Sequence, residues 1–137
     1  MLLITGLPNA GKTTYSKRYE NVIHGDDMKA EGIDLWEAVT REGVVIEGLF
    51  PRAETRRRML NISSRPAVCV FLDISFEECL KREDRGRKEW FLRTHYDWLE
   101  PPTMDEGWDE IIVIGGENET ITTGAGGPSA FLLKETL

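Results

Sequence analysis

The sequence predicts a single α/β domain with one doubly wound, parallel, five-stranded sheet. Short apolar runs rich in β-branched residues alternate along the chain with segments of helical character. The first run leads directly into residues 6–13, GLPNAGKT, which match the phosphate-binding P-loop motif G-x-x-x-x-G-K-[ST]. This motif joins a buried strand to a helix, so it favours the same architecture. A length of 137 residues fits one domain over residues 1–137.

Five apolar runs are expected to form the strands. They are nearly continuously apolar, as in parallel sheets that helices cover on both faces. The runs are residues 2–5, 21–24, 44–47, 67–72 and 111–114. Ligands bind such sheets at the carboxyl ends of the strands, so the polar residues that follow these runs are the candidates for a functional site.

Helices are expected between the strands, at residues 14–19, 34–40, 51–60, 75–84 and 87–99. The third begins at Pro51, because proline is favoured at the first helical position. The fourth begins at Ser75, whose spacing to a glutamate three residues later matches a capping box. Pro101 and Pro102 end the fifth. Residues 115–128 are rich in Gly, Thr and Glu and are expected to form a loop or a weakly ordered tail.

Composition indicates a soluble globular protein, with 40% hydrophobic and 30% charged residues. No apolar run is long enough to span a bilayer, so no membrane partner is expected. The first expected strand starts at residue 2, which leaves no signal peptide ahead of it. Cys69 and Cys79 lie in apolar surroundings and are expected to be buried free thiols. These features together predict a cytoplasmic protein.

The net charge of −7 is unevenly distributed along the chain. Residues 52–93 carry 11 basic and 7 acidic side chains, whereas residues 94–137 carry 1 basic and 9 acidic ones. A broad surface that coats nucleic acid is not expected at this net charge. A local basic patch beside a phosphate site is compatible with it.

The P-loop predicts the contacts to a nucleoside triphosphate. Gly6 and Gly11 let the loop turn tightly and approach a ligand, and backbone N–H groups can converge on phosphate oxygens. Lys12 can reach the β- and γ-phosphates, and the Thr13 hydroxyl can bind Mg²⁺. The predicted nucleotide-binding residues are Gly6, Pro8, Asn9, Ala10, Gly11, Lys12, Thr13 and Thr14. The alternative is a glycine-rich turn that binds nothing.

Acidic residues follow the second and third expected strands. Asp26 and Asp27 come after the run that ends at His24, and transfer of a phosphoryl group to a hydroxyl needs a carboxylate to accept the hydroxyl proton. Asp26 is therefore the candidate base, unless the pair only caps the next helix. Glu47 ends the third run, where it can hold a water molecule of Mg²⁺ or orient an acceptor, or be an ordinary strand-end residue.

Residues 81–88 have the sequence KREDRGRK. A mixed-charge segment of this kind is commonly a solvated helix end. Beside a P-loop it can instead form a lid, here at about residues 82–90, whose arginines close over a transferring phosphoryl group. Arg82 and Arg85 are the candidates for that contact.

Two further groups of side chains have two interpretations each. Arg52, Arg56, Arg57 and Arg58 lie on the helix expected after the third strand. They can contact a polynucleotide backbone or form a solvated face. Aromatic residues gather after the lid, where core packing is the expected role and base stacking the alternative. They are Trp90, Phe91, Tyr96, Trp98 and Trp108.

Four segments carry a family resemblance: ITGLPNAGKTT, HGDDMK, VVIEGLFPRAETRRR and VFLDISFEECLKREDRGR. In order and spacing they resemble the P-loop kinases grouped around polynucleotide 5′-hydroxyl kinases, including the kinase domains of phage polynucleotide kinases. The resemblance covers roughly residues 2–114. It implies a sheet order of 2-3-1-4-5 and ATP with Mg²⁺ as the phosphoryl donor. It also implies kinase activity in the cytoplasm, and in the host cytoplasm if a phage encodes the chain.

The resemblance also implies roles on the acceptor side. The first Asp of the family's pair acts on the acceptor hydroxyl, and this position is Asp26. The family's next contact is an arginine three residues later, where this chain has Lys29, and the family often has Asp where this chain has Glu47. The predicted acceptor-binding residues are Asp26, Asp27, Lys29 and Arg52.

The identity of the acceptor is open at this point. A compact chain suits an acceptor presented from outside, so a nucleic-acid hydroxyl is predicted first, at a polynucleotide 5′ end or on a hydroxymethylated base of phage DNA. A small nucleoside-like molecule is the alternative. A nucleotide-binding switch or slow ATPase is a third interpretation, although the chain lacks the guanine-reading N-K-x-D segment typical of G-proteins.

Overall fold

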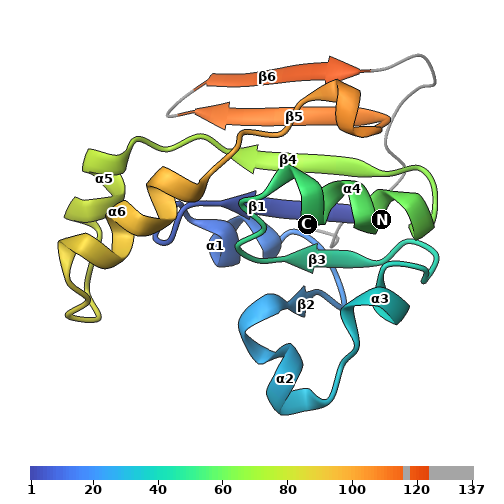
Figure 1. Cartoon of the computed structure of the whole chain (residues 1–137), viewed down its shortest axis with the longest axis horizontal. Helices are drawn as coiled ribbons and strands as arrows, with labels where there is room; N and C mark the ends of the chain where they lie inside the picture. Colours follow the sequence, from blue (N-terminus) through green and yellow to red (C-terminus); the bar gives the residue numbers. More distant parts are fainter. Residues whose placement is uncertain (116–117, 124–137) are drawn as a thin grey trace.

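Figure 1 shows a central sheet flanked by helices in the computed structural model, which describes residues 1–115 and 118–123. The parallel strands are β1 (Leu2–Gly6), β2 (Ile23–His24), β3 (Val45–Glu47), β4 (Val68–Leu72) and β5 (Glu110–Gly115). Their order across the sheet is β2-β3-β1-β4-β5. The predicted fold class and strand order are therefore confirmed.

A sixth strand, β6 (Asn118–Thr123), pairs antiparallel with β5 at the edge of the sheet. The expectation of a loop is wrong for this segment. Its threonines and isoleucine favour extended structure, and an antiparallel neighbour can be reached through a short connection. The rest of the predicted tail lies outside the described residues.

The helices are α1 (Lys12–Ser16), α2 (Met28–Glu31), α3 (Leu35–Ala38), α4 (Ala53–Ile62), α5 (Phe76–Lys81) and α6 (Glu89–Trp98), with 3-10 turns η1 (Gly25–Asp27) and η2 (Met104–Glu106). α4 begins two residues later than predicted, because Arg52 has an extended backbone and is the N-cap. α5 has the predicted cap, since Ser75 Oγ accepts a hydrogen bond from Glu78 N at 3.1 Å. In the described ranges, no helix has the length and apolar character that crossing a membrane requires.

Side chains of the parallel strands alternate between two apolar cores. Leu3 of β1 belongs to one core, with Val39 after α3 and Met59 of α4. Ile4 belongs to the other, with Leu92 of α6. All five residues of β1 are buried, as expected for a strand covered on both faces. This packing leaves the carboxyl ends of the strands as the open edge for a ligand.

Cysteine burial follows the prediction, whereas the aromatic residues follow it only in part. Cys69 and Cys79 are buried and free. Trp108 is also buried and belongs to the core. Three aromatic side chains of α6 are instead exposed: Trp90, Tyr96 and Trp98. Core packing is wrong for those three, because α6 buries only Leu92 fully against the rest of the protein.

Candidate active site

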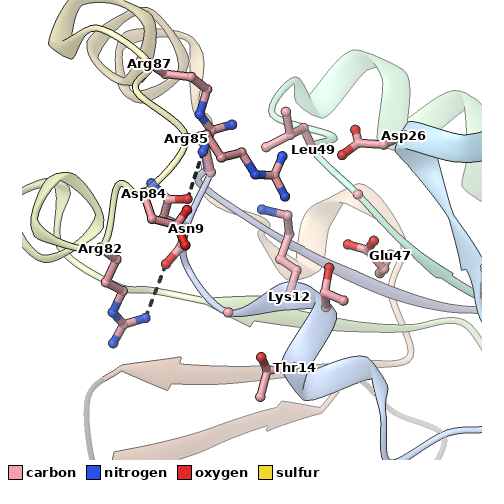
Figure 2. Close-up of a pocket in the computed structure, with 14 residues that line it drawn as sticks. Asn9, Lys12, Thr14, Asp26, Glu47, Leu49, Arg82, Asp84, Arg85 and Arg87 are labelled. Carbon is pink, nitrogen blue, oxygen red and sulfur yellow. Dashed lines mark hydrogen bonds between the residues drawn. The ribbon is translucent and has the colours of Figure 1, made fainter.

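A cavity of about 380 Å³ lies at the carboxyl end of the sheet (Figure 2). It joins the P-loop, the ends of β2 and β3, and the segment after α5 that is predicted to form a lid. Its lining residues are Pro8, Asn9, Gly11, Lys12, Thr13, Thr14, Asp26, Glu47, Gly48, Leu49, Arg82, Asp84, Arg85 and Arg87. The structure thus brings most of the predicted site residues together. Those that lie outside this lining are Gly6, Ala10, Asp27, Lys29 and Arg52.

The shape of the P-loop depends on its glycines. A Cβ atom on Gly6 would lie 2.9 Å from Leu72 O of β4, so the close approach of the two strands requires glycine. Gly11 and Asn9 have left-handed backbones, with φ of 94° and 68°. Glycine adopts this conformation freely, and asparagine does so more readily than most residues. Gly6 therefore affects the shape of the loop through its contact with β4, and it does not line the cavity.

Lys12 is the first residue of α1 and places its ammonium group in the cavity. Its Nζ donates a hydrogen bond to Leu7 O at 2.6 Å. Burial lowers the pKa of Lys12 from 10.5 to about 8, and the carboxylates of Glu47 and Asp26 partly oppose this shift. The side chain is still protonated at pH 7, and a phosphate beside it would stabilise the charged form.

Two carboxylates face the cavity from neighbouring strands (Figure 2). Asp26 is exposed and lies in η1, directly after β2. Glu47 is the last residue of β3, and its side chain is only 7% exposed. Because β2 and β3 are parallel and His24 is in register with Glu47, both strands deliver their acidic residues to the same edge.

His24 is a neighbour of this site that sequence reasoning missed. Its Nδ1 lies 2.8 Å from Glu47 Oε1, so a hydrogen bond fixes one oxygen of the Glu47 carboxylate. Only the register between β2 and β3 reveals this pairing, since the two residues are 23 positions apart in the sequence.

The predicted lid arginines have different surroundings. Arg82 Nε pairs with Glu78 Oε1 at 3.1 Å, and its Nη1 donates to Asn9 O at 3.3 Å. In Figure 2 Arg82 turns away from the cavity centre, whereas Arg85 extends toward Lys12. No side chain among the described residues pairs with the Arg85 guanidinium, so this cation is available to a ligand.

A third arginine of the predicted lid segment, Arg87, also lines the cavity and is not among the predicted site residues. Its Nε lies 2.9 Å from Glu83 Oε1, and its guanidinium stacks 5.2 Å from the centre of the Phe91 ring. The sequence does contain a signal for this pair, since a glutamate and an arginine stand four residues apart at positions 83 and 87.

One of the four arginines predicted to contact a polynucleotide or to form a solvated face is buried. Arg56 is 0% exposed, and its Nε and Nη2 donate to the two oxygens of Glu106 at 2.8 and 2.9 Å. A residue buried in this way can neither contact a nucleic acid nor form a solvated face, so both interpretations are wrong for Arg56. Helical spacing in the sequence shows which residues of α4 share a face. It does not show that η2, which is distant in the sequence, covers that face.

The other three arginines, one at the N-cap of α4 and two within it, are exposed but have partners of their own. Arg52 pairs with Glu100 at 3.1 Å and Arg57 with Asp105 at 3.0 Å. Arg58 stacks on the ring of Trp36, 4.6 Å from its centre. These contacts reduce the positive charge that α4 offers to a phosphate backbone.

The oxygen donors of the cavity fit Mg²⁺ bound together with phosphate. Across the described ranges, no group of three or more His, Cys, Asp or Glu side chains is arranged to hold a metal ion. Mg²⁺ at phosphate sites takes only one or two protein oxygens in addition to phosphate oxygens. The Thr13 hydroxyl and the Glu47 carboxylate both line the cavity and are donors of that kind.

Two known kinases are similar to the chain, although no protein-family model matches it. The L-seryl-tRNA(Sec) kinase of Methanococcus maripaludis is 23% identical, in a match that covers 80% of this chain and 56% of that protein. The chain thus spans little more than half the length of that relative. The chain also matches the crystal structure of a sugar kinase from Janibacter sp. HTCC2649, with a TM-score of 0.62 and 16% sequence identity. The match covers 83% of each of the two chains and shows that they share a fold.

Proposed function

We propose that this chain is an ATP- and Mg²⁺-dependent kinase that transfers the γ-phosphoryl group to a hydroxyl group. One observation carries the proposal: a single cavity holds the P-loop lysine, Lys12, the free lid cation of Arg85 and the strand-end carboxylate of Asp26. A phosphoryl donor, charge stabilisation and a proton acceptor are the three requirements of this reaction. The similarity to two kinases supports the same reaction class.

The donor side is formed by the P-loop and the lid. Backbone N–H groups of the loop and Lys12 would hold the β- and γ-phosphates of ATP. Thr13 and Glu47 would hold Mg²⁺, Thr13 directly and Glu47 through water. The ion, when bound, neutralises charge on the phosphates. Arg85 is the arginine best placed to stabilise the charge on the transferring group, because its guanidinium has no partner within the described part of the chain.

The transfer step uses Asp26 as the proton acceptor. The acceptor oxygen forms a bond to the γ-phosphorus as the bond from that phosphorus to the β–γ bridging oxygen breaks. The hydroxyl proton goes to the Asp26 carboxylate, and ADP leaves with the bridging oxygen. Asp26 lies on the opposite side of the cavity from the lid in Figure 2, which suits an acceptor that enters between them.

A small hydroxyl compound without a phosphate near the accepting group is the acceptor that the charges favour. Every cation in the described cavity lining belongs to the P-loop or the lid, which form the donor side. The acceptor side offers the carboxylate of Asp26, which would repel an anionic acceptor. Lys29 and Arg52, predicted to bind the acceptor, lie outside the lining, and Arg52 is paired with Glu100.

A nucleic-acid hydroxyl is the second candidate. One relative carries the name of a kinase for a seryl group on a tRNA, so an acceptor attached to RNA is compatible with this fold. The exposed Trp90 and Trp98 on α6 also provide flat surfaces on which bases can stack.

A transfer assay with γ-labelled ATP tests the function and the acceptor together. The panel comprises sugars, serine derivatives, nucleosides, DNA and RNA with 5′-hydroxyl ends, and duplex DNA with hydroxymethylated bases. We expect label on a neutral or cationic small molecule. Label only on polynucleotides would support the second candidate and overturn the first. Label released only as inorganic phosphate would identify an ATPase or switch and overturn the kinase proposal.

Exchange of Asp26 for asparagine separates catalysis from donor binding. Asparagine has the same shape but cannot accept a proton, so kcat is expected to fall by about 10²- to 10⁴-fold. The Kd for ATP, measured by calorimetry, should change little because Asp26 lies on the acceptor side. Asp27→Asn is the matched control and should retain activity, since Asp27 is exposed outside the cavity. Equal losses in the two variants would contradict the role of Asp26.

A further inference from the structure

One carboxylate of the lid is almost buried. The Glu83 side chain is 9% exposed, although its neighbours Arg82, Asp84 and Arg85 are exposed. A charged group in such a position needs partners that replace water. The partners of Glu83 come from two segments that are far apart in the sequence.

On the lid side, Glu83 fixes the turn that carries Arg85. Its Oε2 accepts hydrogen bonds from the backbone N–H groups of Arg85 at 2.8 Å and Arg87 at 3.2 Å. Its Oε1 accepts from Arg87 Nε at 2.9 Å. Gly86, with φ of 72°, lies between the two bonded residues and allows the chain to turn there. These bonds set the direction in which the Arg85 side chain leaves the backbone.

On the P-loop side, the partner of Glu83 is Asn9. Asn9 Nδ2 donates to Glu83 Oε1 at 2.9 Å, and Asn9 Oδ1 accepts from Arg87 Nη2 at 2.8 Å. Asn9, Glu83 and Arg87 therefore form a closed ring of hydrogen bonds, here called the latch. The pKa of Glu83 is lowered to about 2, and the hydrogen bond from Asn9 contributes most to this shift. The carboxylate therefore stays charged at any working pH.

The latch differs from an ordinary surface ion pair of the same spacing. Glu89 and Arg93 on α6 are also four residues apart, but they are 60% and 53% exposed and 3.7 Å apart. Pairs of that kind contribute little, because water competes for both charges. The latch includes a third residue from the P-loop, 74 positions before Glu83, and Arg87 is only 24% exposed.

We propose that Glu83 is a positioning residue: through the latch it holds the lid on the P-loop, so that Arg85 projects into the cavity. The proposal rests on the proposed function for the statement that a γ-phosphoryl group lies beneath Arg85. The latch itself is a contact within the protein and exists independently of the reaction. The first arm of the test therefore needs no substrate.

Amide hydrogen exchange on the free protein measures the latch directly. The N–H groups of Arg85 and Arg87 are bonded to Glu83, so in Glu83→Ala they should exchange at least about tenfold faster than in the wild type. Asn9→Ala opens the same ring from the P-loop and should give a smaller acceleration. Glu89→Ala, which removes a glutamate with the same i,i+4 spacing to an arginine, should leave both amides unchanged.

The kinetic arm separates positioning from stability. Misplacement of Arg85 should lower kcat by about 10- to 100-fold in Glu83→Ala. The Kd for ADP should change by less than about threefold, because ADP lacks the phosphoryl group that Arg85 contacts. Since Asn9 and Glu83 act through one ring, the double alanine variant should lose little more kcat than Glu83→Ala alone.

Three results would overturn the proposal. The first is unchanged exchange of the two amides in Glu83→Ala. The second is a kinetic loss no greater than that of Glu89→Ala, and the third is full additivity of the Asn9 and Glu83 substitutions. If no acceptor is phosphorylated, the proposed function fails, whereas faster amide exchange in Glu83→Ala still supports the latch. Should Glu83→Ala fold poorly, Glu83→Gln retains an acceptor oxygen and should show the same changes at smaller size.

Discussion

Replacement of Lys12 by methionine is expected to abolish phosphoryl transfer, with a loss of kcat of at least about 10³-fold. Methionine keeps the length of the apolar stem but removes the charge that would contact the β- and γ-phosphates. The measurement is transfer of label from γ-labelled ATP to the acceptor, with circular dichroism to show that the fold is intact. Activity near that of the wild type would refute the donor site, because Lys12 is the one lysine among the described residues that lines the cavity.

The same variant should be more stable than the wild type at pH 7. Folding lowers the pKa of Lys12 from 10.5 to about 8, so the cost of its buried charge is fully present below pH 8. Between pH 8 and 10.5 the unfolded state binds more protons, so the stability of the wild type rises with pH. The shift corresponds to about 3 kcal/mol at most. Urea unfolding should show an advantage of the methionine variant that shrinks above pH 8; an advantage independent of pH would contradict this account.

Replacement of Arg56 by methionine is expected to lower the free energy of unfolding by about 3–5 kcal/mol. Arg56 is buried and paired with Glu106, and its Nη1 and Nη2 donate to Phe50 O and Glu100 O, both at 2.7 Å. Methionine fills similar volume but leaves the Glu106 carboxylate buried without its cation. Urea or thermal unfolding measures the loss.

Arg57→Met is the control for that experiment. Arg57 is the next residue of α4 and also pairs with an acidic residue of η2, Asp105, but the two side chains are 46% and 73% exposed. An exposed pair contributes less than about 1 kcal/mol. Similar losses in the two variants would mean that the burial of the Arg56 pair does not determine its effect.

Much of the fold could be predicted from sequence, because its signals are local. Continuous apolar runs are typical of strands covered on both faces, and each predicted run overlaps one observed parallel strand. The Ser75 cap fixed the start of α5 in the same local way. The spacing of the P-loop motif predicts both the tight turn and the residues that contact phosphate, and Lys12 and Thr13 do line the cavity. β6 was missed, since its strand propensity competes with a glycine-rich context that favours a loop.

Residue types and their order along the chain indicate the chemistry available at the strand ends: a P-loop lysine, an aspartate after β2, a glutamate at the end of β3 and arginines after α5. Which of these groups are free and which are paired depends on how the elements pack together. In the structure Arg56 is buried, His24 is hydrogen-bonded to Glu47, and Glu83 and Arg87 are hydrogen-bonded to Asn9. These pairings link residues 23 to 78 positions apart. Such contacts depend on strand register and packing between elements, which local propensity and spacing do not encode.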